Sequence, residues 1–255
     1  MEKLVSIDLK ADFGFFRKPD ANNTINLSYN IIHKPAILGV LGAVLGLEGY
    51  KEKGKLPAYY ETLKDIKTGV EPLEEEKGSY RKTNIKYSNT VGYANKGSNF
   101  LTEEMTLVNP QYRIYLLLET ENAWHQSLLH NLSNAQSEFI PYFGKNEFTA
   151  WWEKTSFREY SFEQNPHITE SIRIKTVFQK DLVLRTNSEE VVGFLPNPDD
   201  PIPFLYFERL PKKLDANLMQ YDLGEFAYST FYVKNAGNLQ NLYYIKDEDY
   251  YVQLI

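Results

Sequence analysis

Two pairs of basic residues near the start of the chain have the chemistry of an anion-binding site. Arg17 and Lys18 lie on a loop, and His33 and Lys34 lead directly into an apolar run at residues 35–48. This run predicts a helix with a proline in its first turn, where the missing N–H costs nothing. Unpaired N–H groups and the helix dipole favour anions at such a position. We therefore predict a phosphate-binding corner formed by these four residues.

Both pairs also have an interpretation without a ligand. Arg17 and Lys18 could be a solvated loop pair that contacts no partner. His33 could be a residue at a strand end whose ring is satisfied by protein groups. The types and spacing of these residues leave both interpretations open.

Three glycines lie on one face of the expected helix. Gly39, Gly42 and Gly46 recur at three- and four-residue spacing, which places them in line. Glycine costs about 1 kcal/mol at each position of a helix interior, so their presence indicates very close packing. We interpret them as packing of the helix on a sheet rather than as contacts with a ligand.

Residues 77–102 combine basic and aromatic side chains and contain no acidic residue. Residues 79–94 and 98–109 predict a hairpin, with an Asn-x-Gly turn signal at 95–97. Single-stranded RNA is bound by cations along its backbone and by aromatic faces, each stacked base contributing about 1–3 kcal/mol. The alternative is a solvated hairpin whose tyrosines pack across the strands. The RNA-binding residues predicted here are Arg81, Lys82, Lys86, Tyr87, Tyr93 and Lys96.

A third candidate site lies in a short loop after the second predicted helix. Gly144, Lys145 and Asn146 could offer backbone N–H groups and one ammonium to a phosphate; the alternative is an ordinary tight turn. The neighbouring Trp151 and Trp152 are expected to be core or subunit-interface anchors.

Charge is distributed unevenly along the 255 residues, whose net charge is −6. Residues 1–100 hold 15 Lys and Arg against 12 Asp and Glu, whereas residues 101–255 hold 13 against 22. A surface for a polyanion is therefore expected in the N-terminal half. The acidic remainder is expected to face protein subunits or solvent.

Several classes of site are absent from the sequence. The chain has no cysteine, which excludes disulfides, thiolate metal sites and cysteine nucleophiles. It has no Walker loop and no Gly-x-Ser-x-Gly motif, and His125 and His130 are five residues apart, so they do not share a helix face. We expect no metal and no cofactor. Metal-independent RNA cleavage needs only a positioned acid or base and cations, so His33 beside Lys34 keeps that alternative open.

The order of expected elements predicts an α+β fold. Strand 3–10, helix 35–48, the hairpin, strand 113–119 and helix 121–132 fit a ferredoxin-like split βαβ unit. Beyond residue 155 the pattern predicts strands alone, at 172–178, 182–185, 204–210, 226–233 and 242–255. We therefore divide the chain into residues 1–155 and a β-rich region, 156–255, packed on them. Acidic residues interrupt any signal-peptide core, and the apolar run is too short to span a bilayer, so a cytoplasmic location is expected.

Three segments together resemble a known protein family. These are the Phe-x-Arg-x-Pro loop at 15–19, the helix motif at 34–46 and Phe-Gly-Lys-Asn-Glu-Phe at 143–148. They are similar to the Cas-five family, RAMP-superfamily subunits of type I CRISPR Cascade complexes, and are closest to the I-B subtype. The resemblance covers most of residues 1–150 and thins out afterwards.

The resemblance implies a ferredoxin-like (RRM-like) palm with a protruding hairpin thumb at about 77–109. Such a subunit caps the 5′ handle of the guide RNA (crRNA) and contacts the Cascade backbone subunit and large subunit. It reaches target DNA only through the guide, is not catalytic in most subtypes and has no membrane partner. A defence complex and a transposon-guiding complex would bind the 5′ handle in the same way.

Two alternatives from other classes stand beside this interpretation. One is a metal-independent endoribonuclease that processes precursor crRNA, as the I-C subtype does; its nuclease residues are not recognisable here. The other is an unrelated acidic α+β protein that binds no RNA.

Overall fold

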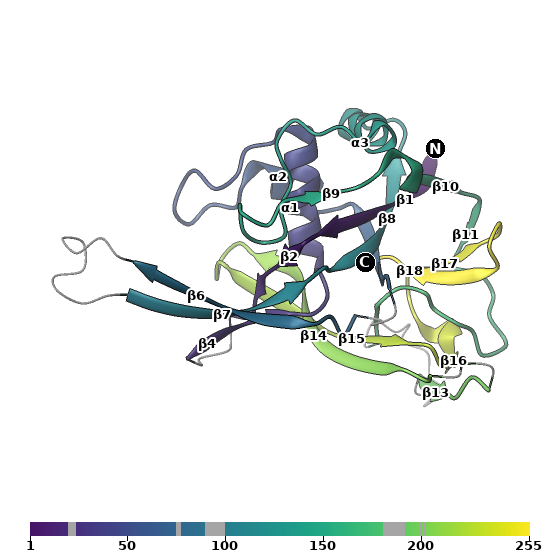
Figure 1. Cartoon of the computed structure of the whole chain (residues 1–255). Helices are drawn as coiled ribbons and strands as arrows, with labels where there is room; N and C mark the ends of the chain where they lie inside the picture. The colour runs from purple at the N-terminus through teal and green to yellow at the C-terminus, as the bar shows by residue number, and fades with distance from the viewer. Residues whose placement is uncertain (20–23, 75–77, 90–99, 181–191, 199, 201) are drawn as a thin grey trace.

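A central antiparallel sheet organises the N-terminal half of the molecule (Figure 1). The computed structural model describes residues 1–19, 24–74, 78–89, 100–180, 192–198, 200 and 202–255. Four strands follow the order β10-β1-β8-β5, and a short fifth strand, β9, also pairs with β1. Their bounds are β1 Glu2–Ala11, β5 Lys67–Pro72, β8 Gln111–Glu119, β9 Ala150–Trp151 and β10 Arg158–Tyr160. The mixed α+β class predicted from the sequence is confirmed.

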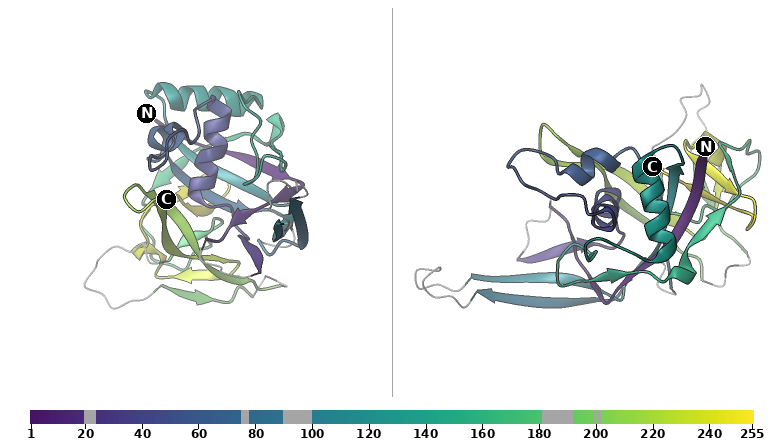
Figure 2. Two further views of the ribbon diagram at one scale, coloured as in Figure 1. Left: turned by 90° about the vertical axis from the view of Figure 1, so that its left-hand side faces the viewer. Right: turned by 90° about the horizontal axis from the view of Figure 1, so that it is seen from above.

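Two helices cover one face of this sheet, as Figure 2 shows from two further directions. Helix α1 (Lys34–Leu45) follows β1, and α3 (Ala123–Asn134) follows β8. Alternate β1 residues such as Val5 and Ile7 share a core with Leu38 of α1 and Leu128 of α3. Strand β8 lies between two strands and is buried over most of its length, which explains its continuous apolar run. No helix of the described ranges is long and apolar enough to cross a membrane.

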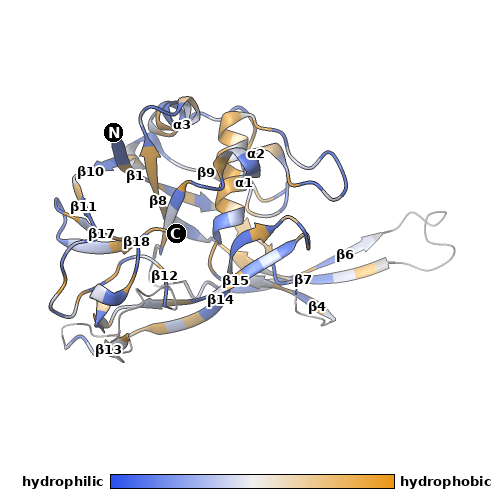
Figure 3. Ribbon diagram, turned by 180° about the vertical axis from the view of Figure 1, so that it is seen from behind, coloured by the Kyte–Doolittle hydropathy of each residue, from blue (hydrophilic) through white to orange (hydrophobic). Residues whose placement is uncertain are grey.

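Of the three glycines predicted to pack on a sheet, Gly42 serves close packing against another helix, and Gly39 has room for a methyl group. Helix α2 (Ala58–Leu63), which the sequence did not predict, places Tyr59 against α1. A Cβ on Gly42 would lie 2.5 Å from the Tyr59 Cβ, and one on Gly39 would lie 3.9 Å from its ring. Gly46 instead ends the helix in the left-handed conformation, with φ 71°. Figure 3 shows how apolar α1 is along its length.

The predicted hairpin is present and projects away from the body (Figures 1 and 2). Strands β6 (Lys82–Asn89) and β7 (Phe100–Val108) pair in register from Lys82 with Leu107 to Asn89 with Phe100. Three shorter strands join β7 and one another at the hairpin's base: β2 (Phe13–Gly14), β3 (Phe16–Arg17) and β4 (Ile25–Tyr29). The predicted tip lies outside the described residues, and so do two predicted RNA contacts there, Tyr93 and Lys96.

The C-terminal region is β-rich, as predicted, although several predicted strands have other bounds. Its strands are β11 Phe162–Gln164, β12 Phe178–Gln179, β13 Gly193–Leu195, β14 Leu205–Asp215, β15 Gln220–Ser229, β16 Tyr232–Lys234, β17 Leu242–Ile245 and β18 Tyr250–Gln253. Two 3-10 turns, η1 (Lys154–Ser156) and η2 (Ala236–Asn238), complete the elements. Segment 172–178 was wrongly predicted as one strand. It forms only isolated bridges before β12, because its partners come from different strands. Segment 182–185 lies outside the described residues.

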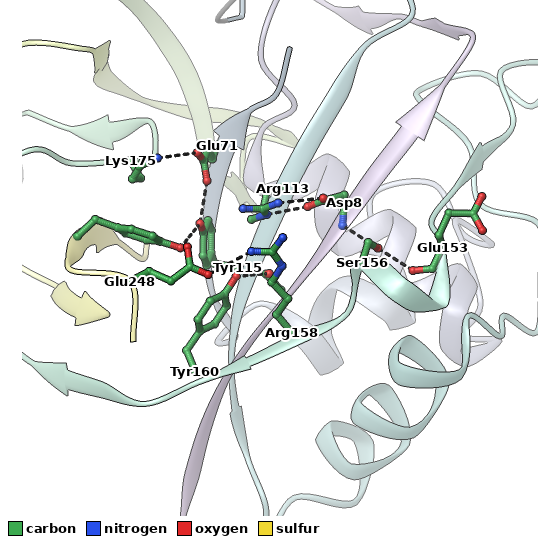
Figure 4. Close-up of polar contacts among 12 residues, drawn as sticks. Asp8, Glu71, Arg113, Tyr115, Glu153, Ser156, Arg158, Tyr160, Lys175 and Glu248 are labelled. Atoms are coloured by element: carbon green, nitrogen blue, oxygen red, sulfur yellow. Dashed lines mark hydrogen bonds and ion pairs between the residues drawn. The ribbon is translucent and has the colours of Figure 1, made fainter. Parts of the chain in front are cut away.

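Strands β17 and β18 cover the sheet face opposite the helices. Leu4 and Tyr115 of the sheet form a second core with Val252 and Leu254. Beside this core, Arg113 donates to both oxygens of the Asp8 carboxylate at 2.7 and 2.9 Å (Figure 4).

Buried hydroxyl contacts continue this polar network. The Tyr115 hydroxyl donates to Glu71 at 2.7 Å and lies 3.0 Å from the Tyr250 hydroxyl. Lys175 lies 3.9 Å from the same Glu71 carboxylate (Figure 4). These contacts tie the C-terminal strands to the sheet, so that face is closed and the functional site must be sought elsewhere.

Candidate nucleic-acid interface

An open groove of about 630 Å³ runs along the exposed side of α1. Its lining comes from segments far apart in the sequence: residues 15–17, which include β3, one face of α1 including Gly39, and the loop at 139–145. Leu214 of β14 and Tyr221 of β15 complete the lining. The fold therefore brings residues of all three resemblance segments to one concave surface.

Gly144 explains how two of these loops lie so close. Its φ is +82°, and a Cβ there would lie 1.9 Å from the carbonyl oxygen of Phe15. The Phe15 N–H also donates to the Phe143 carbonyl at 3.0 Å. Only glycine fits this approach. Residues 144–146 form a tight turn in which Asn146 is exposed, and their predicted contact with phosphate stays a prediction.

The hairpin divides the predicted RNA contacts between its two faces. Side chains alternate along a strand, so Lys82, Asn84 and Lys86 share one face of β6 while Ile85 and Tyr87 lie on the other. The sequence prediction treated all of these residues as one surface. The alternation separates them.

On the first face Lys86 has an acidic partner, and so does Lys18, whose charge lies close to Lys82. Lys86 forms an ion pair with its cross-strand neighbour Glu103 at 2.9 Å. Lys18 forms an ion pair with Glu208 of β14, and its ammonium lies 5.1 Å from the centroid of the Tyr29 ring. Burial lowers the pKa of Lys82. This face carries less net positive charge than the acid-free segment implied, because residues distant in sequence supply carboxylates.

On the second face, Tyr87 and Glu104 meet the loop at 143–148. The Lys145 ammonium lies 2.5 Å from Glu104 and 3.9 Å from the centroid of the Tyr87 ring. Glu104 and Lys145 both line the groove, and so does Arg17, whose side chain is exposed. No ion pair within the described ranges involves Arg17.

His33 and Lys34 do not present charge to the groove as the sequence suggested. His33 is buried, and its Nδ1 accepts the Ala36 N–H at 3.3 Å as the N-cap of α1. Burial lowers its pKa to about 3, so the ring is neutral. Lys34 donates to the backbone oxygen of Ile255 at 3.0 Å, and burial lowers its pKa to about 8. Of the predicted corner, Arg17 is the residue that faces the groove as an exposed cation.

Aromatic and apolar side chains that were not predicted from the sequence form one end of the groove. Tyr50, Phe139, Ile140 and Tyr142 are all exposed there, and Tyr59 lies on the adjacent wall. Burial raises the pKa of Tyr50 and of Tyr59, so both hydroxyls stay protonated. The run Phe139-Ile140 before a proline was the available signal. This end can offer ring faces and hydroxyl groups but no charge.

The remaining predicted residues lie around this site. Arg81 is exposed at the start of the hairpin, and its carbonyl accepts the Val108 N–H at 2.8 Å. Trp152 is a core residue whose ring N–H donates to the Leu132 carbonyl at 2.9 Å, as predicted, whereas Trp151 is exposed. Within the part of the chain that the structure describes, no cluster of three or more His, Asp or Glu could hold a metal ion.

Comparisons with known proteins give similar structures but no related sequence. No family model and no curated protein matches the chain. A chain of a CRISPR RNA-guided surveillance complex is similar with a TM-score of 0.49 at 10% identity, covering 96% of this chain and 95% of that one. A chain of the type III-B Cmr-beta complex bound to cognate target RNA is similar with a TM-score of 0.45 at 11% identity, covering 99% of each chain. A functionally uncharacterized protein from Streptococcus mutans has a TM-score of 0.33 at 10% identity, covering 63% of this chain and 67% of that one.

Proposed function

We propose that this protein is a non-catalytic, guide RNA-binding subunit of a CRISPR effector complex, of the Cas-five type. The observation that carries the proposal is the meeting of the three resemblance segments, 15–19, 34–46 and 143–148, around one groove beside a projecting hairpin. Segments that are separated in sequence and share one surface are expected when that surface has a common ligand.

The topology supports a ferredoxin-like palm. When the β6–β7 hairpin and the shorter elements between them are left aside, the chain order is strand β1, helix α1, strands β5 and β8, helix α3 and strand β10. Their order in the sheet places the fourth strand beside the first, and the third between the first and the second. This order supports the proposal of a split βαβ unit. On this scaffold the β6–β7 hairpin corresponds to the thumb.

The chemistry of the groove suits the 5′ handle of a guide RNA. Arg17 supplies an exposed cation to the groove lining, and Tyr50 and Tyr142 supply exposed aromatic faces. Single-stranded RNA uses both kinds of contact, phosphate to cation and base to aromatic ring. Lys82 and Arg81 at the hairpin base extend the cationic surface beyond the groove. The handle's phosphates would meet these cations while its unpaired bases enter the groove.

The proposed task of the subunit is to hold the handle and set the register of the assembly. Guide pairing would then read the DNA, while this protein holds backbone geometry. The hairpin would reach toward the backbone subunit, and the C-terminal strands would remain available to the large subunit. No chemical step is assigned to any residue.

RNA binding as a function of salt tests the proposal. The probe is a labelled handle RNA from the repeat sequence of the source genome, titrated between 50 and 200 mM KCl. Phosphate neutralisation makes affinity fall steeply with salt, with a slope of about −0.7 for each phosphate on a single strand. We expect Arg17→Glu and Lys82→Glu to weaken binding, and the exposed Lys53→Glu, on the loop after Gly49, to leave it unchanged. Absence of binding, or equal effects of all three changes, would overturn the proposal.

A further inference from the structure

Lys145 has an unusually complete set of partners for a lysine beside a proposed RNA site. Its ammonium lies 2.5 Å from a Glu104 oxygen, 3.7 Å from Glu147 and 3.9 Å from the centroid of the Tyr87 ring. The Tyr87 hydroxyl in turn donates to Glu147 at 3.2 Å. The side chain of Lys145 is only 24% exposed and that of Glu104 only 11%.

The backbone that carries Lys145 is held as firmly as its side chain. The Phe148 N–H donates to the Lys145 carbonyl at 2.9 Å, and the Phe143 N–H donates to the Phe148 carbonyl at 2.8 Å. Gly144 holds this loop against Phe15. The ammonium therefore extends from a closed turn anchored to the body of the protein.

The partners of Lys145 come from both strands of the hairpin. Tyr87 lies on β6 and Glu104 on β7, and both belong to the same face. One side chain thus connects the body to each strand of the projecting element. A contact of this kind restricts rotation of the hairpin about its base.

We infer that Lys145 is a positioning residue that fixes the hairpin relative to the groove, and not a ligand of RNA phosphate. This inference rests on the proposed function. A phosphate that took the ammonium would leave the mostly buried Glu104 carboxylate without its cation, which is strongly unfavourable. Burial lowers the pKa of Lys145, but its hydrogen bonds to Glu104 and Tyr87 outweigh this effect, and the pKa is raised overall. The ammonium therefore stays charged among these partners.

The two roles predict opposite signs for Glu104→Gln. If Lys145 binds phosphate, removing the competing carboxylate frees the cation and strengthens RNA binding. If Lys145 positions the hairpin, the same change loosens the hairpin and weakens binding. Where the competent orientation falls to about one tenth of the population, affinity falls about tenfold.

The salt dependence of RNA binding gives a second readout. For Lys145→Gln we expect about tenfold weaker binding with an unchanged slope of log affinity against log salt. Arg17→Gln, in contrast, should reduce the slope by about 0.7. Lys145→Arg should restore binding because it keeps the charge. A stronger-binding Glu104→Gln, or a reduced slope for Lys145→Gln, would overturn the inference.

A measurement without RNA separates this inference from the proposed function. The chain has no cysteine, so Ser88→Cys on the hairpin and Ser127→Cys on α3, both exposed, can each carry one spin label. We expect a narrow distance distribution with Lys145 present and a broad one in Lys145→Gln, with Lys53→Gln as the matched control. Equal widths would refute the positioning role even if RNA binding is found. If the distance distribution broadens in Lys145→Gln but the protein binds no handle RNA, the proposed function is refuted and the positioning role is not.

Discussion

The Nδ1 atom of His33 accepts the Ala36 N–H at 3.3 Å, so an imidazole caps the first turn of α1. The ring also packs edge-on against Tyr29 and Tyr221, with ring centroids 5.5 and 5.2 Å away. A ring used in this way is a structural element of the groove wall. The Nδ1 atom must carry no proton in order to accept this hydrogen bond.

The burial of His33 predicts an acid-sensitive fold. Its pKa is lowered from 6.5 to about 3 by burial. Between these values His33 of the unfolded chain binds a proton and His33 of the folded chain does not. The free energy of unfolding therefore has its full value above pH 6.5 and decreases as the pH falls toward 3. The slope reaches about 1.4 kcal/mol per pH unit.

The measurement is urea unfolding at a series of pH values for the wild type and His33→Asn. Asparagine is a good N-cap without a titrating ring. The difference in unfolding free energy between the two proteins should change with pH only in this window. A constant difference from pH 7 to 4 would contradict the prediction.

Gly144→Ala should be among the most damaging changes of a single methyl group. A Cβ there meets the Phe15 carbonyl oxygen at 1.9 Å in addition to the strained φ of +82°. Gly54, with φ +80° and no atom within 4 Å of a Cβ, is a matched control for the backbone strain alone. We expect about 1 kcal/mol from Gly54→Ala and about 3 kcal/mol or more from Gly144→Ala, measured by denaturant unfolding. Equal losses would show that the loop relaxes.

Much of the sheet and helix arrangement was predictable because local periodicity determines it. The apolar alternation of β1, the continuous apolar run of β8 and the helical spacing in α3 each arise within one segment. Helix α2 has only six residues, which is too short for a periodic signal. The prediction of one strand at 172–178 was wrong for a different reason, because the pairing partners of this segment lie on several strands.

The sequence was sufficient to predict which segments form the candidate site, but not which of their charged side chains have partners of opposite charge. The sequence pointed to the three segments that line the groove, yet it could not show that Glu208 reaches Lys18 across 190 residues. It also treated residues 77–102 as one acid-free surface, whereas pairing with β7 places Glu103 and Glu104 on opposite faces of the hairpin. Ion pairs between distant segments leave no local pattern.

The Asp8–Arg113 pair should stabilise the sheet beneath the C-terminal strands. Arg113 makes two hydrogen bonds to one carboxylate, and these bonds raise its pKa. Both side chains are mostly buried, so removing one partner leaves an uncompensated charge. We expect Asp8→Asn and Arg113→Met to cost about 2–4 kcal/mol singly, with a coupling of about 1–3 kcal/mol in the double mutant. Additive losses in urea unfolding would contradict this coupling.

The two faces of the hairpin should differ in their importance for RNA binding. Lys86 is already paired with Glu103 at 2.9 Å and lies on the face opposite Glu104, so we do not expect it to contact the RNA. Arg17 has an exposed guanidinium at the groove, on the side that Glu104 and Lys145 also line. We expect Arg17→Gln to weaken handle RNA binding about fivefold to tenfold and Lys86→Gln less than twofold, since one phosphate contact contributes roughly 1 kcal/mol.

Lys86→Gln combined with Glu103→Gln is the control that makes this comparison decisive. Because the double change removes a compensated pair, it should bind RNA as the wild type does. If the handle instead runs beyond Lys82 along the same face of β6 as far as Lys86, the phosphate competes with Glu103 for the Lys86 ammonium. Glu103→Gln alone would then strengthen binding, and Lys86→Gln would weaken it as much as Arg17→Gln. Anisotropy titrations of these four variants at one salt concentration therefore identify the face of the hairpin along which the RNA runs.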